Sequence, residues 1–489
     1  MSAGLPAYTL ILAYRMLSLR LCMQACSVSR LPSGAFRVSY WRIFMHKRLK
    51  RIICAGTAAL VWTLTCVTAW AGVDTAATFQ VDSNSWKNWP AGPDIQGDTA
   101  VVMELETGAV LYNKGMDAQR YPASITKIMT AMLVLENCDL NGQVTMTETG
   151  MADAYSGSSN CLPKLGEVFS VEQCLQMIMI KSANDVSTQV AEYMSGSVQG
   201  FADRMNSRAA ELGCQNTHFC NASGLENNDH YTSAHDMALI MREALKYDKF
   251  REILAMQNVT IPATNMSGER YYETHVQMMV PGNPYYYEGC FGGKTGYTDI
   301  SKSTLVTCAQ RDGITLIGVV MGGIDSNLIC DDMKAVLDYG FQNFTKTDAS
   351  YGCETISGGT AMLPQNVKLE SLTTKAEETE EGTLVTYELS NQVVGSAVMT
   401  DENYAVFQEK RGVKDSGNQE GEAESESSVV TVSRPTEEKQ ISDSDEGQGS
   451  GTKLAVYIAI AILGILILGG VVLIFLGASK KNNRRKRRR

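Results

Sequence analysis

Two apolar stretches, each beside a basic cluster, restrict where the body of this chain can fold. The first, residues 52–69, follows the basic segment 45–51 and ends at Ala69-Trp70-Ala71, a small-x-small pattern typical of a signal-peptide cleavage site. The second, residues 454–476, is long enough to cross ~30 Å of hydrocarbon as a helix. Eight basic residues follow it in 480–489, which predicts a cytoplasmic tail and a body outside the cell.

These stretches predict the ends of the domain organisation. Residues 1–71 are expected to be an N-terminal extension and signal peptide, with Met45 as the start of translation. An uncleaved N-terminal anchor is the alternative. At the other end, residues 412–452 are rich in Glu, Ser, Gly and Asp, which is typical of a disordered acidic stalk. A transmembrane helix is expected over 453–478 and a basic tail over 479–489.

The charge of the body excludes one class of partner. The 489-residue chain has a net charge of −10, but residues 74–479 carry 26 basic against 53 acidic residues. Such a body repels polyanions, so we expect no binding to nucleic acid. Nine of the 13 cysteines follow the cleavage site, and their spacing fixes neither disulfides nor free thiols. The sequence contains no C-x-x-C pair, and we expect no metal or other cofactor.

The order of expected elements predicts an α/β (α+β) fold, in which helices pack on an antiparallel sheet. Period-2 patterns predict strands over 99–105, 109–113, 292–297, 303–310 and 315–323. Helical periodicity predicts helices that begin at Ser124 and over 171–180, 185–194, 234–245 and 330–344. We expect one domain over 80–348. Residues 349–411 show only short strand patterns, including 383–389 and 404–408, and are expected to form a small β domain.

Ser124-Ile125-Thr126-Lys127 is the first of three short motifs that could carry chemistry. On a helix, Ser124 and Lys127 lie one turn apart on the same face. A serine hydroxyl needs an adjacent base to act as a nucleophile, and a lysine serves if its pKa is lowered. A capping serine with a surface lysine would give the same spacing.

The other two motifs are Ser182-Ala183-Asn184 and Lys294-Thr295-Gly296. The first lies between two expected helices, where its serine and asparagine could shuttle a proton and hold a backbone, or could simply cap a helix. The second lies in a glycine-rich strand, where bare backbone lets a ligand approach. A glycine-rich turn with an exposed lysine is its alternative. Each motif is weak alone, but the three in this order are specific.

With these motifs the chain resembles the low-molecular-mass penicillin-binding proteins that act as D-alanyl-D-alanine carboxypeptidases, a serine peptidase family with a β-lactamase/transpeptidase-like fold. The resemblance covers residues 99–344, and such enzymes often carry a small β domain and a C-terminal anchor. Two departures occur. Ala222-Ser223 replaces a frequent Pro-His pair, and Ser301-Lys302 replaces a usual Ala-Gly pair.

The resemblance implies a role for each motif residue. Ser124 would attack the penultimate D-Ala carbonyl of a peptidoglycan stem peptide, with Lys127 as general base and Ser182 as proton shuttle. Residues implied in substrate binding are Asn184, Lys294, Thr295, Gly296 and Tyr297. Lys294 and Thr295 would bind the terminal carboxylate, and the backbone N–H groups of Ser124 and Tyr297 would form the oxyanion hole. Stem peptides ending in D-Ala-D-Ala and β-lactam antibiotics are the implied partners, with the membrane as anchor.

Several alternatives remain at this point. A D,D-endopeptidase or transpeptidase would use the same residues. A class A β-lactamase would need a deacylating glutamate followed four residues later by asparagine, and none of the eight glutamates between the second and third motifs has one. A zinc peptidase is disfavoured because the five histidines form no metal-binding pattern. His230 and His235 are interpreted as a surface and a helix-start residue. A non-catalytic wall-binding protein would not need the serine-lysine pair.

Overall fold

The computed structural model describes residues 73–154 and 157–412. The predicted signal peptide, acidic stalk, membrane span and basic tail lie outside these residues. In the described part of the chain, no helix is both long and apolar enough to cross a bilayer.

A five-stranded antiparallel sheet lies at the centre of the fold, with the strand order β2-β1-β9-β8-β7. Its strands are β1 (Thr99–Glu104), β2 (Val110–Lys114), β7 (Cys290–Thr298), β8 (Lys302–Arg311) and β9 (Ile314–Gly323). The period-2 patterns predicted all five. Strands β1, β8 and β9 bury mainly apolar side chains, whereas the buried positions of β7 are three glycines and Lys294. Asp312 and Gly313 join β8 to β9 with φ values of 48° and 78°, the left-handed geometry of a two-residue hairpin turn.

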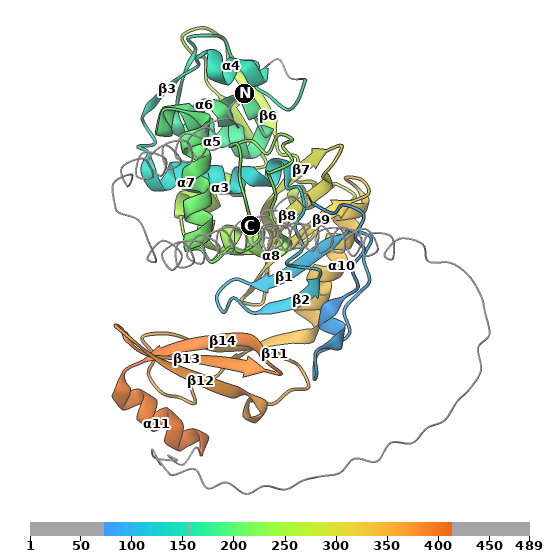
Figure 1. Ribbon diagram of the computed structural model, residues 1–489, viewed down its shortest axis with the longest axis vertical. Helices are drawn as coiled ribbons and strands as arrows, with labels where there is room; N and C mark the ends of the chain where they lie inside the picture. The colour runs from blue at the N-terminus through green and yellow to red at the C-terminus, as the bar shows by residue number, and fades with distance from the viewer. Residues whose placement is uncertain (1–72, 155–156, 413–489) are drawn as a thin grey trace, which may run out of the picture. The chain divides into compact units, whose positions relative to one another are not determined.

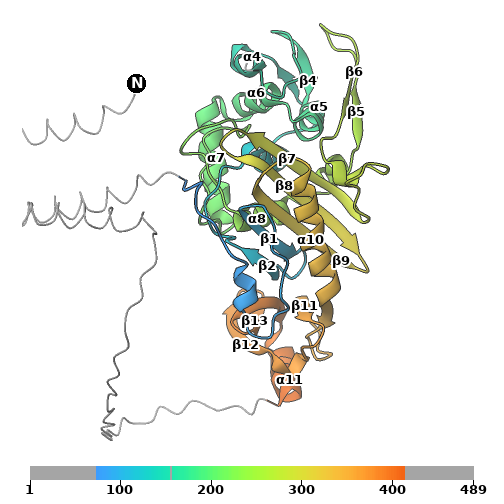
Figure 2. The same cartoon turned by 90° about the vertical axis from the view of Figure 1, so that its right-hand side faces the viewer.

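Alternate residues of the sheet face two different helical layers. On β1, Val101 and Met103 belong to the core shared with α8 (Ala234–Ala244), whereas Ala100 and Val102 belong to the core shared with α10 (Leu328–Asn343). Figure 2 shows α8 and α10 on opposite faces of the sheet. The sheet is therefore covered on both faces, and β7 forms one of its two edges.

The helical layer on the α8 side is built from segments between β2 and β7 (Figure 1). Its larger helices are α3 (Lys127–Asn137), α5 (Val171–Gln176), α6 (Asn184–Ser195), α7 (Val198–Glu211) and α9 (Asp248–Leu254). Smaller elements of this layer are η3 (Ala123–Thr126), β3 (Gln143–Thr145), α4 (Glu148–Ala154), β4 (Val168–Ser170), η4 (Met177–Lys181), β5 (Asn258–Ile261), β6 (Arg270–Glu273) and η5 (Gln277–Met279). The short turn η2 (Asp82–Ser85) precedes β1 in the chain and contacts β2. The predicted helix over 171–180 is thus α5 followed by the π-helical turn η4, whose last residue leads into the second motif.

A second antiparallel sheet follows α10, with the strand order β10-β11-β14-β13-β12. Its elements are β10 (Phe344–Asp348), β11 (Ser357–Pro364), η6 (Leu369–Ser371), β12 (Thr373–Thr379), β13 (Gly382–Leu389) and β14 (Gln392–Met399). The strand predicted over 383–389 is confirmed as β13. The strand predicted over 404–408 is wrong, because this segment lies in α11 (Asp401–Arg411).

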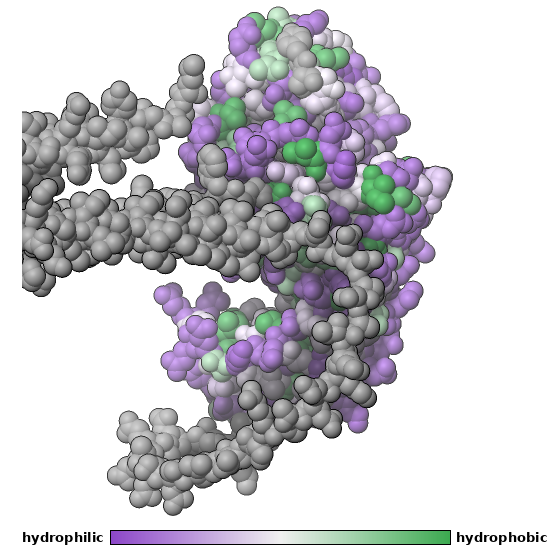
Figure 3. Space-filling model, turned by 45° about the vertical axis from the view of Figure 1, so that its right-hand side comes forward, coloured by the Kyte–Doolittle hydropathy of each residue, from purple (hydrophilic) through white to green (hydrophobic). Residues whose placement is uncertain are grey.

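The spacing of aromatic residues explains why the segment 404–408 is helical. Tyr404 and Phe407 lie one helical turn apart and their rings stack at 6.3 Å, so both contribute to one face. Thr400 caps the helix by accepting a hydrogen bond from the backbone N–H of Asn403. Phe407 is buried against Tyr387 of β13, which fixes α11 on the second sheet. The face of the molecule shown in Figure 3 is mainly hydrophilic, with hydrophobic residues in separate small areas.

Candidate active site

Ser124 lies in the short 3-10 turn η3, directly before α3 begins at Lys127. The α-helix expected to begin at Ser124 therefore begins three residues later. In a 3-10 turn, residues i and i+3 are aligned, so this geometry brings the two side chains of the motif together. Ser124 is partly exposed, whereas Lys127 is fully buried, with 0% of its surface exposed. A capping serine with a surface lysine is thereby excluded.

The Lys127 ammonium nitrogen has three oxygen neighbours at hydrogen-bond distance. Its Nζ lies 2.9 Å from Ser124 Oγ, 2.6 Å from Asn184 Oδ1 and 2.6 Å from the Ser223 carbonyl oxygen. Three contacts fix the position of a flexible side chain, and one of them is with the hydroxyl group of Ser124. Ser223, one of the departures from the family pattern, contributes only its backbone here, so this contact does not depend on its side chain.

The surroundings of Lys127 favour its neutral form. Burial lowers the pKa of Lys127 well below its usual value, and the nearby charge of Lys294 lowers it further, against the opposing effects of Asp185 and Asp153. A neutral amine 2.9 Å from a serine hydroxyl can accept the proton of that hydroxyl. This arrangement can therefore activate Ser124 as a nucleophile.

The second motif connects the two lysines of the site. Ser182 follows η4 with a left-handed φ of 61°, and its Oγ accepts a hydrogen bond from Lys294 Nζ at 2.9 Å. Asn184 begins α6, where its Oδ1 accepts from Lys127 and its Nδ2 donates to Ser158 Oγ at 2.8 Å. The motif thus holds each lysine through a different side chain, which simple helix capping does not require.

Lys294 lies on the edge strand β7 but does not face the solvent. Its side chain is 1% exposed, and its Nζ donates to Ser182 Oγ and to the Thr295 carbonyl oxygen, both at 2.9 Å. Burial lowers the pKa of Lys294 to about 7. The alternative of a glycine-rich turn with an exposed lysine is excluded, because the motif is a strand and the lysine is buried.

Gly296 allows β7 to approach the turn that carries Ser124. A Cβ atom at Gly296 would lie 2.8 Å from the backbone nitrogen of Ser124 and 2.4 Å from Thr304 Oγ1. Gly224 also approaches this turn closely, since a Cβ atom there would lie 1.8 Å from the carbonyl oxygen of Ala123. The N–H of Ser124 and the strand residue Tyr297 therefore border the same space, as an oxyanion hole requires.

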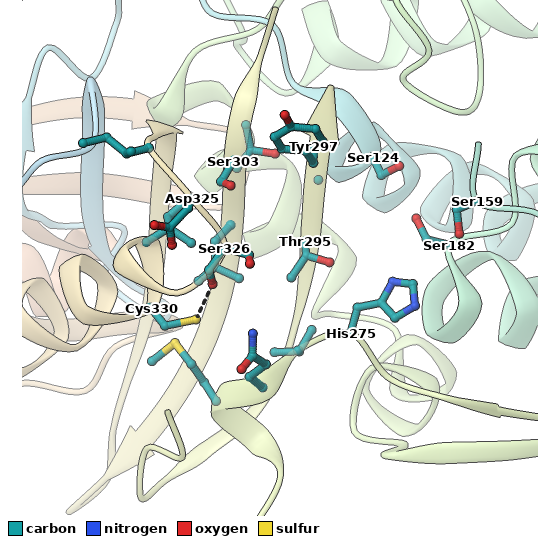
Figure 4. A pocket seen from close by; sticks show the side chains of 18 residues that line it. Ser124, Ser159, Ser182, His275, Thr295, Tyr297, Ser303, Asp325, Ser326 and Cys330 are labelled. Atoms are coloured by element: carbon teal, nitrogen blue, oxygen red, sulfur yellow. Dashed lines mark hydrogen bonds between the residues drawn. The ribbon is translucent and has the colours of Figure 1, made fainter. Parts of the chain in front are cut away.

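A pocket of about 580 Å³ opens at this position. Of the eight site residues predicted from the sequence, Ser124, Ser182, Thr295, Gly296 and Tyr297 line it. The remaining three, Lys127, Asn184 and Lys294, lie buried. Lys127 and Lys294 donate hydrogen bonds to the pocket-lining serines Ser124 and Ser182, whereas the Asn184 side chain accepts from Lys127. Figure 4 shows Ser124, Ser182 and Thr295 around the same opening, on segments far apart in the sequence.

The sequence analysis missed the other residues that line the pocket, among them the polar side chains of Ser159 and His275. Ser159 precedes the second motif by 23 positions, and its carbonyl oxygen accepts from the backbone N–H of Asn184. His275 lies between β6 and η5 in a segment with no period long enough to predict an element. The only sequence feature that could have indicated an ordered segment here is the alternation of polar and apolar residues from His275 to Met278.

His230 is buried, so its interpretation as a surface residue was wrong. Its Nε2 lies 2.9 Å from Thr126 Oγ1, and its Nδ1 accepts from the backbone N–H of Cys220 at 3.0 Å. Burial, with smaller contributions from His218 and Lys127, lowers the pKa of His230 to about 3. His230 thus supports η3 as a neutral side chain. His235 lies at the start of α8, as predicted.

Comparisons with known proteins identify the family of this chain. A family model described as D-alanyl-D-alanine carboxypeptidase (peptidase S11) matches residues 87–325. The carboxypeptidase DacB2 of Mycobacterium tuberculosis is 30% identical over 262 residues, which cover 52% of this chain and 86% of that protein. DacF of Bacillus subtilis is 33% identical over 252 residues, covering 51% of this chain but only 63% of the relative.

A solved structure supports the fold. The D-alanyl-D-alanine carboxypeptidase DacD from Francisella tularensis aligns with a TM-score of 0.50 at 22% identity, over 64% of this chain and 94% of that chain. The family match includes all three motifs, and the structure brings their side chains together at one pocket. The chain therefore belongs to the D-alanyl-D-alanine carboxypeptidase family of serine peptidases.

Proposed function

We propose that this enzyme removes the terminal D-Ala from peptidoglycan stem pentapeptides through an acyl-enzyme on Ser124. The observation that carries this proposal is the distance of 2.9 Å between Ser124 Oγ and a fully buried Lys127 Nζ. Burial and a second lysine favour the neutral amine, which is the form that can act as a base. β-Lactam antibiotics are expected to acylate the same serine.

In the acylation step, Ser124 transfers its hydroxyl proton to Lys127 as Oγ bonds to the penultimate D-Ala carbonyl carbon. The backbone N–H groups of Ser124 and Tyr297 stabilise the oxyanion. The peptide C–N bond then breaks, and the leaving D-Ala amine takes a proton from Ser182. Lys294, 2.9 Å away, returns a proton to Ser182.

In the deacylation step, water adds its oxygen to the ester carbonyl and gives its proton, through Ser182, to Lys294. The ester C–O bond breaks, and Ser124 recovers its proton from Lys127. Both lysines then regain their initial protonation states, so the cycle needs no other proton source. No glutamate lines the pocket among the described residues, which favours this lysine-based scheme over that of a class A β-lactamase.

Two measurements on the purified ectodomain test this function. Wild-type protein is expected to form a stable adduct with a labelled penicillin and to release D-Ala from diacetyl-Lys-D-Ala-D-Ala. Ser124→Ala is expected to abolish both. Ser207→Ala, on the exposed face of α7, is the matched control and is expected to retain both. Labelling that persists in Ser124→Ala would identify another nucleophile and overturn the proposal.

We also propose that the protein is exported and held in the cell membrane by a single C-terminal helix, with the catalytic domain outside. Support comes from the sequence alone, namely the signal-peptide pattern, the apolar run 454–476 and the basic residues 480–489. Protease added to intact cells should digest the catalytic domain and leave a C-terminal fragment. A protected catalytic domain with a digested tail would reverse the proposed topology.

A further inference from the structure

The pocket beside Ser124 contains little positive charge of its own. Lys127 and Lys294 lie beneath it and are fully buried. Among the described residues that line the pocket, His275 is the only one whose side chain can become a cation, and Asp325 is the only carboxylate. A substrate that ends in a carboxylate must nevertheless be oriented there.

His275 is held at the pocket wall by its neighbours in the chain. Val276 and Met278 are both buried, and the backbone N–H of Val276 donates to Thr274 Oγ1 at 3.2 Å. His275 retains solvent-exposed surface and lines the pocket. Figure 4 shows its ring directed into the opening, towards Ser182 and Ser159. Neither ring nitrogen has a hydrogen-bond partner among residues 73–154 and 157–412.

The two ends of the pocket differ in electrostatic character. Partial burial of the ring, together with the charges of Lys294 and Lys181, lowers the pKa of His275 to about 4. The imidazole is therefore neutral at neutral pH and keeps one N–H donor. Asp325 lies on the other side of β7, before α10, so its carboxylate disfavours an anion at that end (Figure 4).

We propose that His275 is a specificity-determining residue that donates a ring N–H to the terminal carboxylate of the substrate. This inference rests on the proposed function and identifies the group that its pocket recognises. The carboxylate would lie near Thr295 and Ser182, where the buried Lys294 ammonium attracts it from behind. The bound anion in turn favours a protonated His275, which strengthens the contact.

The test compares two peptides, diacetyl-Lys-D-Ala-D-Ala and the same peptide with a C-terminal carboxamide. For the carboxylate peptide, His275→Ala is expected to raise KM by roughly 10-fold or more with little change in kcat, the effect of one hydrogen bond to a charged group. The kinetics of the carboxamide peptide should not change. His275→Gln, which keeps an N–H donor, should restore part of the preference for the carboxylate peptide over the carboxamide peptide. His235→Ala, outside the pocket, is the matched control.

A second readout separates failure of this inference from failure of the proposed function. The rate of covalent labelling is measured with a penicillin and with its methyl ester. His275→Ala should slow labelling by the free acid and leave the ester unaffected, whether or not the wild-type enzyme releases D-Ala. Equal effects on acid and ester, or on both peptides, would overturn the role of His275. Absence of D-Ala release from wild type with intact labelling would overturn only the carboxypeptidase activity.

Discussion

A Cβ atom on Gly296 would lie 2.8 Å from the backbone nitrogen of Ser124, closer than side-chain carbons pack. The two residues are 172 positions apart, and the contact joins the edge strand β7 to the turn η3. Thr304 of β8 supports the same junction, because its Oγ1 donates to the Pro122 carbonyl oxygen at 2.8 Å. The space proposed for the oxyanion therefore exists only because position 296 has no side chain.

The first prediction is that Gly296→Ala folds but acylates slowly. The added methyl group would push η3 away from β7 and misplace one of the two N–H donors. Loss of one such donor typically costs roughly 10²–10³-fold in rate. Stopped-flow labelling with a fluorescent penicillin measures the acylation rate, and thermal melting verifies the fold. Gly268→Ala is the matched control, because a Cβ atom there meets nothing within 4 Å. A normal acylation rate in Gly296→Ala would contradict the assignment of the oxyanion hole to this position.

The three motifs could be predicted from the sequence because each lies in a segment whose periodicity is clear. The strands around Lys294 and the apolar helix behind Lys127 both have strongly patterned buried faces. Periodicity does not report how deeply a side chain is buried by other segments. The burial of Lys294 depends on η4 and Ser182, which lie 112 positions earlier, so the sequence alone suggested a lysine open to the substrate.

The second prediction concerns the acid limb of the pH–rate profile. Lys127 must be neutral to act as a base, so activity falls as the pH decreases through its pKa. Removing the charge of Lys294 by Lys294→Gln raises the pKa of Lys127, and the acid limb should move to higher pH. Because the pKa of Lys294 is itself lowered to about 7, the effect should appear below neutral pH. Penicillin acylation rates measured from pH 4 to 9 give the limb directly.

Lys181→Gln is the control for this shift. Lys181 also lies near the site, but it is not among the charges that move the pKa of Lys127. Removing the charge of Lys181 should not change the pH at which the acid limb of the rate profile occurs. Equal shifts in both variants would indicate a general effect of net charge, and no shift in Lys294→Gln would contradict the coupling of the two lysines.

A third prediction follows from the contact between Asn184 Oδ1 and Lys127 Nζ at 2.6 Å. Asn184→Asp keeps the shape of the side chain but places a carboxylate beside the amine, which favours the ammonium form. Acylation at pH 7 should fall by ~10²-fold, the scale of lost general-base catalysis, and should recover partly at higher pH. Penicillin labelling across pH measures both effects. Asn141→Asp, on an exposed loop, should acylate normally. A pH-independent loss would instead indicate a structural defect.

Sequence patterns also could not locate the residues that border the site from loops. His275 and Ser159 belong to short connections whose conformation depends on contacts with other segments. His230 illustrates the same limit, because it was interpreted as a surface residue but lies buried beside Thr126 of η3. Contacts of this kind are set by tertiary packing, which overrides the local preferences that a sequence displays.

The last prediction concerns the ion pair between Glu167 and Arg270, which ties the loop before β4 to β6. The Glu167 side chain is 0% exposed, and its Oε1 lies 2.8 Å from Arg270 Nη2. Arg270→Ala would leave a buried carboxylate without its cation and should lower the free energy of unfolding by about 3 kcal/mol or more.

Burial opposes ionisation of Glu167, but hydrogen bonds from Thr264, the Lys164 N–H and Arg270 lower its pKa overall. The stabilisation is therefore present above the unfolded pKa of about 4.3 and is lost as pH falls through the lower folded value. Urea unfolding at pH 7 and pH 3 should show a large difference in unfolding free energy between Arg270→Ala and wild type only at pH 7.

The control is Lys246→Ala, which breaks an exposed ion pair with Glu243 and should lower the unfolding free energy by less than about 1 kcal/mol. A loss for Arg270→Ala as small as that control at pH 7 would contradict a stabilising role for the buried pair.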